Sequence, residues 1–309
     1  MTNIEKYINK IIKYENDKNE KELINIAYGI DDNYVRCMLT SILSFKLNNI
    51  NNNIIFHVIT NGLNDENLLK IKSVSKKYKI NIIIYILYDN IFNELPVKIH
   101  WSKAMYFRFI LPEILNSIEK VFYFDADIIC LKKAPKFFSI DLKENIVAAV
   151  LDVKRIALKK EKIFKLKENS YFNSGVLIIN IKEWNKYKVL SKVIKCIKED
   201  PKKYKHPDQD ALNVVLQNKI KYIPKFYNCI DFYEIKDPND IVLLHFANHP
   251  KPWNKYWFLN IIYNDFTKNI YSFYENKIFS DKKREGYKTY SMLIKWIIKF
   301  LLFKLIKRV

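Results

Sequence analysis

Glycine is scarce in this 309-residue chain, which contains only four glycines, and the prolines number nine. So few of both leave little room for long flexible linkers, and they disfavour a glycine-rich loop that cradles phosphates. Residues 1–21 are charged and lack the apolar segment of an export signal, so we expect a protein that is not exported. The cysteines form no C-x-x-C pair, which argues against a zinc site or a disulfide framework and fits a reducing compartment; they are Cys37, Cys130, Cys196 and Cys229.

The charge is strongly unbalanced, with a formal net charge of +20 at pH 7. Such a balance fits three kinds of partner: nucleic acid, an anionic membrane, or a negatively charged substrate. Lysine, asparagine and isoleucine are all abundant, as an AT-rich coding sequence alone would produce, so the charge selects none of the three. With 49% hydrophobic and 28% charged residues, the composition is that of a globular protein with ample material for a core.

Short apolar runs alternate with helix-like segments through the first half of the chain. This alternation predicts parallel strands joined by crossover helices, hence an α/β fold with a mostly parallel sheet covered on both faces. Ligands of such sheets bind outside the carboxyl ends of the strands. The predicted strands are residues 23–29, 54–60, 80–87 and 121–124, and the predicted helices are residues 33–47 and 64–78. The second half adds buried strands within residues 171–184 and 241–246 and a helix within residues 206–216.

Two aspartates, Asp125 and Asp127, follow the run VFYF at the carboxyl end of the predicted fourth strand. In an extended strand, side chains at i and i+2 point the same way, so both carboxylates can converge on one cation. Such oxygen ligands suit magnesium, manganese or calcium, and a nitrogen ligand from His245 would favour manganese. The alternatives are a strand-end turn in which one aspartate caps a backbone N–H, and a hydrogen-bonded structural histidine.

Five motifs occur together in order: IDDNY, DAD, FNSG, HPDQDALN and LHF…KPW. On these motifs, residues 23–258 resemble the family-eight retaining glycosyltransferases, among them bacterial lipopolysaccharide galactosyl- and glucosyltransferases. The resemblance implies a nucleotide-sugar-binding fold of the GT-A type over residues 23–280. A charged extension, residues 1–22, would precede it, with a solvated helix as the default expectation, and a basic apolar helical tail, residues 281–309, would follow.

The resemblance also implies a manganese ion, or magnesium in its place, and UDP-galactose or UDP-glucose as the donor. The matching donor-binding positions are Asp31, Asn33 and Tyr34 for uridine, Asp125 and Lys251 for the diphosphate with Asn248 beside them, and Asn173 in the sugar pocket. The matching metal ligands are Asp125, Asp127 and His245. The matching residues around the reacting sugar are Arg108, Asp208 and Gln209.

One position departs from the family pattern, because Asn248 stands where relatives usually have glycine in H-x-x-G-x-x-K-P-W. Asparagine tolerates a left-handed backbone, so the loop can keep its shape. Several assignments also have structural alternatives. Asp31 or Asp32 could be a helix N-cap, Arg108 could pair with a surface acid, and the acids of residues 208–210 could favour a helix N-terminus.

For the chemistry, we expect same-face attack, in which a diphosphate oxygen accepts the acceptor proton and the Gln209 carbonyl dipole stabilises the sugar cation. Double displacement with Gln209 as nucleophile stays open, although an amide is a poor nucleophile compared with a carboxylate. Two other classes compete: a metal-dependent nucleotidyltransferase and a nucleic-acid-binding protein. The chain has no recognisable nucleic-acid-binding motif, so we expect no nucleic-acid partner.

The last residues, SMLIKWIIKFLLFKLIKRV (291–309), combine apolar side chains with five cations. A spanning helix needs about 20 mostly apolar residues, and this run is too short and too charged. Its lysines can reach lipid headgroups while its aliphatic groups enter the interface. We therefore expect a cytoplasmic enzyme bound peripherally to an anionic membrane surface, with an oligosaccharide or lipid-linked saccharide as acceptor. The alternative is a C-terminal helix packed on the domain.

Overall fold

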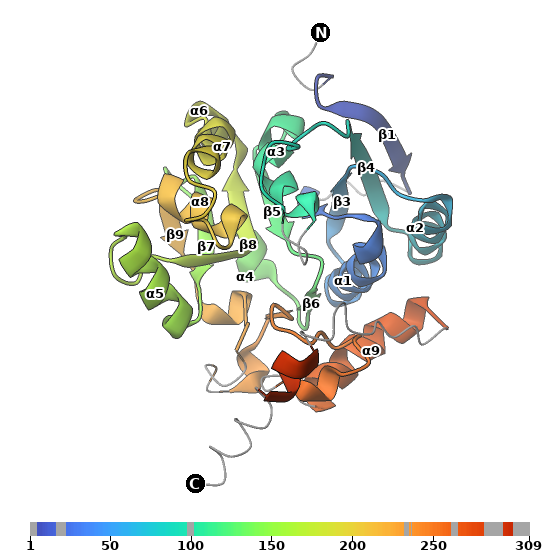
Figure 1. The fold of residues 1–309 in the computed structure, drawn as a ribbon. Coiled ribbons are helices and arrows are strands. Elements are labelled where there is room, and N and C mark those ends of the chain that lie inside the picture. The colour runs from blue at the N-terminus through green and yellow to red at the C-terminus, as the bar shows by residue number, and fades with distance from the viewer. Residues whose placement is uncertain are drawn as a thin grey trace, which may run out of the picture.

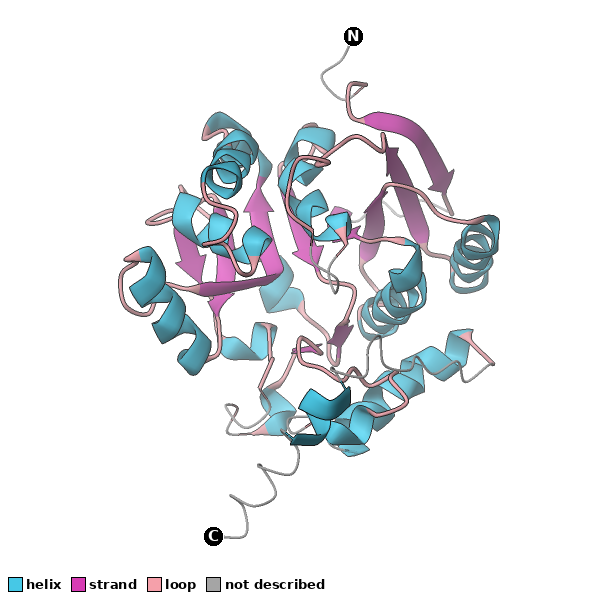
Figure 2. Cartoon of the chain, viewed as in Figure 1, coloured by secondary structure: helices cyan, strands magenta, loops and turns pink. Residues whose placement is uncertain are grey.

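The computed structural model describes residues 5–16, 23–97, 102–231, 235, 237–260, 265–280 and 293–298. Its centre is an eight-stranded sheet with the order β1-β4-β3-β2-β5-β8-β7-β9. Figure 2 shows these strands running through the middle of the molecule between the helices. The strands are β1 (Ile8–Tyr14), β2 (Leu23–Gly29), β3 (Asn53–Thr60), β4 (Asn81–Leu87), β5 (Lys120–Phe124), β7 (Val147–Leu151), β8 (Phe172–Asn180) and β9 (Ile220–Tyr222).

The sheet is mixed but mostly parallel. Strands β4, β3, β2 and β5 run parallel, β8 is antiparallel to both β5 and β7, and β9 is parallel to β7. The predicted α/β fold class and the predicted strands at residues 23–29, 54–60, 80–87 and 121–124 are confirmed. Because β7 and β5 point the same way, their carboxyl ends and those of β2 to β4 share one edge of the sheet.

Strand β1 corrects the expectation of a solvated helix in the N-terminal extension. Residues 8–14 form an edge strand that pairs antiparallel with β4, with Ile12 opposite Ile84. The sequence INKIIKY is rich in β-branched isoleucine, and its lysines suit an exposed sheet edge.

Helices cover both faces of the sheet, and Figure 1 shows α1 and α2 beside β3 and β4, with α5 to α8 gathered around β7 to β9. The α-helices are α1 (Val35–Asn48), α2 (Asp65–Tyr78), α3 (Phe107–Ile114), α4 (Pro135–Phe138), α5 (Lys154–Phe164), α6 (Ile181–Lys186), α7 (Val189–Glu199), α8 (Pro207–Val215) and α9 (Asp265–Ile278). Short 3₁₀ helices are η1 (Asp32–Tyr34), η2 (Lys103–Tyr106), η3 (Lys225–Tyr227), η5 (Pro238–Asp240) and η6 (Trp257–Leu259).

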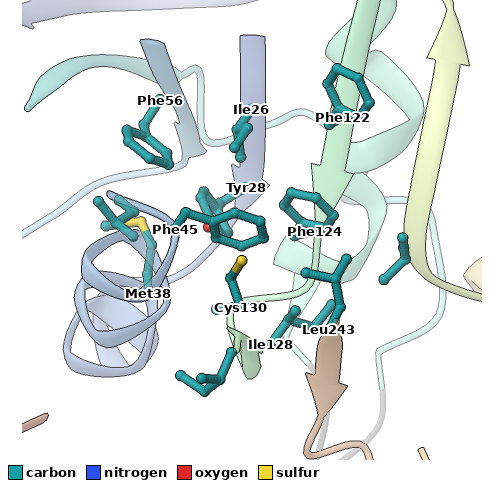
Figure 3. Packing of buried hydrophobic residues seen from close by; sticks show 14 of the residues in the cluster. Ile26, Tyr28, Met38, Phe45, Phe56, Phe122, Phe124, Ile128, Cys130 and Leu243 are labelled. Carbon is teal, nitrogen blue, oxygen red and sulfur yellow. The ribbon is translucent and has the colours of Figure 1, made fainter. Parts of the chain in front are cut away.

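Alternate residues of each strand face two separate cores. On β5, Phe122 and Phe124 pack with α1 and α4, whereas Val121 and Tyr123 pack with the elements of the opposite face, α3 and α6 to α8. Figure 3 shows the first core, in which the rings of Phe45 and Phe124 stack with centroids 4.6 Å apart. Burial of both faces explains why these strands are nearly continuous apolar runs.

A second, two-stranded sheet lies beyond the end of β5. Strand β6 (Ile128–Cys130) pairs antiparallel with β10 (Leu243–His245), so the predicted strand within residues 241–246 does not join the main sheet. Helix α9 then lies along α1, where Arg36 is paired with Glu275 at 2.8 Å (Figure 1). The β6–β10 pair therefore brings the C-terminal part of the chain back to the carboxyl edge of the main sheet.

Most of the predicted tail, residues 281–309, lies outside the described residues. Residues 293–298 are helical, with Ile294, Ile297 and Ile298 exposed and Trp296 buried. Among the residues that the structure describes, no helix combines the length and the apolarity that crossing a membrane requires.

Candidate active site

The centre of the site is a cluster of three side chains at the carboxyl edge of the sheet that could hold a metal ion. One ligand atom from each of Asp125, Asp127 and His245 lies within 4.8 Å of the other two. Nε2 of His245 is 3.2 Å from Oδ1 of Asp127 and 3.9 Å from Oδ2 of Asp125. The two aspartates lie in the turn between β5 and β6 rather than along one extended strand, and the turn brings them together with His245 at the end of β10.

The chemistry of this cluster fits a divalent cation. Oδ1 of Asp127 is buried and has no hydrogen-bond partner among the described residues. Burial raises the pKa of Asp127, but Lys251 and His245 together outweigh burial and hold the pKa well below its ordinary value. Two carboxylates and one imidazole form an oxygen and nitrogen donor set that suits manganese or magnesium.

Lys251 lies inside the cluster. Its Nζ atom is 2.6 Å from Oδ2 of Asp127 and also donates to the carbonyl oxygen of Phe246. The predicted diphosphate-binding lysine is thus held by a carboxylate of the predicted metal site.

Arg108, on α3, is buried and links the metal cluster to the start of α8. Its guanidinium pairs with Asp125 at 2.7 Å and with Asp208 at 3.3 Å, and it donates to the carbonyl oxygen of Ser174 at 2.7 Å. Burial raises the pKa of Asp208, although the nearby Arg108 opposes this effect. The alternative in which Arg108 pairs with a surface acid is wrong, because its partners lie in the site.

Gln209 is held in one orientation by hydrogen bonds from both sides. Its Oε1 accepts from the backbone N–H of Ser174 at 3.1 Å and from Nδ2 of Asn173 at 3.0 Å. Its Nε2 donates to Oδ2 of Asp152 at 2.7 Å. Our sequence analysis missed Asp152, whose pKa is raised by burial. It directly follows β7, so the rule that singled out Asp125 after β5 could have found it.

The loop after β2 shows which of its two aspartates caps the following helix. Asp31 caps η1 by accepting from the N–H of Asn33 at 3.0 Å, while Asp32 accepts from the backbone and side chain of Asn64. Asn33 is exposed and Tyr34 is half-buried. Because β2 pairs with β5, this loop lies on the strand next to the one that carries the metal cluster.

Asn248 does not adopt the left-handed backbone that asparagine tolerates. The described residues other than glycine that have a positive φ do not include Asn248, which lies half-buried between β10 and Lys251. The loop between His245 and Lys251 therefore takes its shape without the conformation that favours glycine.

Gly175, within the FNSG motif, is a further residue that our sequence analysis did not single out. A β-carbon at this position would lie 2.3 Å from Cε1 of His245 and 2.9 Å from Oδ2 of Asp125. Glycine is therefore required here for space. The only signal in the sequence is its place two residues after Asn173, in a chain with few glycines.

Together, a mostly parallel sheet and a pair of aspartates joined by a histidine at its carboxyl edge define a glycosyltransferase of the GT-A class. The model of the family described as "Glycosyl transferase family 8" matches residues 25–256, and the chain belongs to this family. The predicted resemblance is confirmed, and the protein is an enzyme of the glycosyltransferase class.

Two relatives and one solved structure illustrate the similarity. The chain is 29% identical to lipopolysaccharide 1,2-glucosyltransferase of Escherichia coli, over 87% of this chain and 86% of the relative. It is 32% identical to lipopolysaccharide 1,3-galactosyltransferase of Salmonella typhimurium, over 77% and 75% of the two chains. The galactosyltransferase LgtC, solved in complex with donor and acceptor sugar analogues, shares the fold with a TM-score of 0.72 at 20% identity, covering 82% of this chain and 96% of that one.

Proposed function

We propose that the protein transfers glucose or galactose from a UDP-sugar to a saccharide acceptor of lipopolysaccharide or another cell-surface glycan, with retention of configuration. The observation that carries this proposal is the cluster of Asp125, Asp127 and His245 beside a buried lysine. The relatives named for lipopolysaccharide glucosyl and galactosyl transfer support the hexose and the acceptor class.

Asp125, Asp127 and His245 would hold manganese, or magnesium in its place. When bound, the cation supplies Lewis-acid stabilisation of the charge that develops on a departing diphosphate. The lysine adds to this stabilisation: Lys251 is buried, so its ammonium acts in a medium where charge interactions are stronger than in water. A nucleotide diphosphate would compete with Asp127 for the Lys251 ammonium.

The residues around the reacting sugar would be Arg108, Asn173, Asp208 and Gln209. Arg108 is fixed by Asp125, Asp208 and Ser174, so it needs no rearrangement as charge develops. Gln209 is likewise held by two donors on Oε1. We propose same-face attack, with the oriented Gln209 carbonyl dipole stabilising the sugar cation, since an amide is a poor nucleophile.

Asp31, Asn33 and Tyr34 would bind the uridine, with Asn248 near the diphosphate. The base selectivity tests the donor assignment: with manganese present, UDP should raise the melting temperature more than GDP or ADP. Incubation with UDP-glucose and UDP-galactose should then release UDP and form a glycoside. Equal shifts with all three nucleotides would contradict the uridine assignment, and release of pyrophosphate instead would indicate a nucleotidyltransferase.

We also propose that residues 281–309 bind the enzyme peripherally to the cytoplasmic face of a membrane, where a lipid-linked acceptor would lie. The exposed side chains of Ile294, Ile297 and Ile298 support this location. The catalytic domain would then comprise residues 23–280, with strand β1 from residues 1–22 attached at its edge.

A further inference from the structure

Asn228, which no motif singled out, lies between the metal cluster and Gln209. It follows η3 and is buried, with 3% of its surface exposed. Its Nδ2 donates to Oδ1 of Asn173 at 2.9 Å, and its Oδ1 lies 2.8 Å from Nδ1 of His245. A single amide thus connects a predicted metal ligand to a predicted sugar-pocket residue.

Two backbone N–H groups determine which way the amides in this chain of contacts point. The N–H of Gly175 lies 2.9 Å from Oδ1 of Asn173, and the N–H of Ser174 lies 3.1 Å from Oε1 of Gln209. A backbone N–H can only donate, so both facing side-chain atoms must be oxygens. The other end of the Gln209 amide supports this orientation, because its Nε2 faces a carboxylate oxygen of Asp152, which can only accept.

The same logic fixes Asn228. Because Oδ1 of Asn173 is an acceptor, the Asn228 atom that faces it must be the amide nitrogen, and the other Asn228 atom, Oδ1, faces His245. The reverse orientation would place two carbonyl oxygens 2.9 Å apart. A carbonyl oxygen only accepts, so Nδ1 of His245 carries a proton.

A proton on Nδ1 affects what the other ring nitrogen of His245, Nε2, can bind. In a neutral imidazole with a proton on Nδ1, Nε2 has a free lone pair. That lone pair lies 3.2 Å from Oδ1 of Asp127, a buried oxygen with no hydrogen-bond partner in the described part of the chain. Two acceptors at this distance are stabilised by a cation between them.

We propose that Asn228 is a positioning residue that holds His245 in the Nδ1–H tautomer, with Nε2 free to bind the metal. Through Asn173 it also connects this ligand to Gln209, so the metal ligand and the sugar-pocket amide are oriented by one chain of hydrogen bonds. Partners of this kind fix the ring orientation and raise the basicity of a histidine ligand. The inference requires the proposed metal site, but the ring tautomer can be measured without metal or substrate.

The first test is the ¹⁵N NMR spectrum of the His245 ring in the full-length, metal-free protein at pH 8, assigned by comparison with His245→Gln. We expect a proton on Nδ1, the ring atom that faces Oδ1 of Asn228. A ring that carries a proton on Nε2 and none on Nδ1 overturns the proposal. This result depends on no variant of Asn228.

The second test compares two substitutions of Asn228 by their effect on Mn²⁺ affinity, measured by electron paramagnetic resonance with UDP present. Asn228→Leu removes the acceptor for His245, and Mn²⁺ binding should weaken by about 10- to 100-fold while the ring becomes a mixture of tautomers. Asn228→Asp keeps an acceptor for His245 but loses the donor to Asn173, so it should keep the tautomer and lose less affinity than Asn228→Leu.

A folded Asn228→Leu protein with wild-type Mn²⁺ affinity and a single Nδ1–H tautomer overturns the proposal. If Asn228→Leu does not fold, the wild-type spectrum and the Asn228→Asp protein decide the question. A change of the His245 tautomer in Asn228→Asp would also overturn the proposal. Absence of Mn²⁺ binding by the wild-type protein would instead contradict the proposed function, and the NMR result would be unaffected.

Discussion

Gly175 and His245 lie so close together that a β-carbon on Gly175 would be 2.3 Å from Cε1 of His245. The substitution Gly175→Ala must therefore displace the imidazole, and it also crowds Oδ2 of Asp125 at 2.9 Å. We expect Mn²⁺ affinity to fall by about 10- to 100-fold, as when the surroundings of a metal ligand are disturbed.

Gly62→Ala is the matched control for this experiment. A β-carbon there meets nothing within 4 Å, but the φ of +152° disfavours an L side chain. This variant should lose some stability and keep its Mn²⁺ affinity. Equal Mn²⁺ affinity in Gly175→Ala and the wild-type protein would contradict the predicted clash.

The two aspartates of the proposed metal site should differ in how much stability is lost when each is replaced. Asp125→Asn and Asp127→Asn should each reduce transfer by about 100-fold or more, since a neutral amide binds a cation poorly. Asp127→Asn should also destabilise the fold by about 3 kcal/mol, because it leaves the buried Lys251 without its carboxylate. Asp125→Asn should destabilise the fold less, because Arg108 keeps a second carboxylate partner, Asp208, at 3.3 Å.

Turnover with manganese and urea unfolding measure the two effects separately. Asp141→Asn, at an exposed carboxylate outside the site, is the control for both. Near-normal turnover in both site variants would remove the proposed metal site.

His57 should make folding stability depend on pH. It is buried, its ring nitrogens contact Asn25 and Tyr85, and burial lowers its pKa to about 4. The unfolded chain, with a histidine pKa of about 6.5, binds the proton first as the pH falls. Stability from this group is thus fully present above about pH 6.5 and falls by about 3 kcal/mol by pH 4.

Because other groups also titrate in this range, the measurement is the difference between the wild-type protein and His57→Gln in urea unfolding at pH 7.5 and pH 4. The variant should lose less stability than the wild-type protein on acidification. Identical pH dependence in the two proteins would show that His57 is not held neutral by the fold.

The tail should bind membranes through its exposed isoleucines. Deletion of residues 285–309 should leave a folded enzyme that still hydrolyses the donor but no longer sediments with anionic liposomes. Serine at positions 294, 297 and 298 should weaken sedimentation without unfolding the protein, since all three side chains are exposed.

Leu69→Ser provides the control, because Leu69 is an exposed apolar residue on α2. Unfolding or aggregation after the deletion would show that the tail belongs to the core. The burial of Trp296 would then reflect packing of the tail against the core.

The parallel strands could be predicted because a strand that is buried on both faces is a nearly continuous apolar run in the sequence. Strands β2, β3 and β4 are such runs, and their positions were predicted closely. Strand β1 has no such signal, since its lysines point to solvent and its pairing with β4 joins segments about 70 residues apart. A local pattern cannot report a partner that is distant in the sequence.

The same limit applies to the site. Asp125, Asp127 and His245 lie in motifs whose order identified the family. Asn228 contributes through contacts that form only after folding, and asparagine is too common in this chain to be conspicuous. Asp152 was missed because it follows β7, a strand that we did not predict. The clash at Gly175 is likewise a property of the distance between β8 and β10, which no spacing in the sequence reveals.

The pairing of β6 with β10 has an energetic consequence. Phe246 donates its N–H to the carbonyl oxygen of Asp127, and His245 is paired with Ile128, so Asp127 and His245 lie at adjoining positions of this ribbon. A cation bound by Asp127 and His245 would thus join segments that are more than 100 residues apart, and detaching β10 from β6 would require its release. Ion binding and the local unfolding of the C-terminal part are then linked equilibria, so occupancy of the site protects that segment from proteolysis.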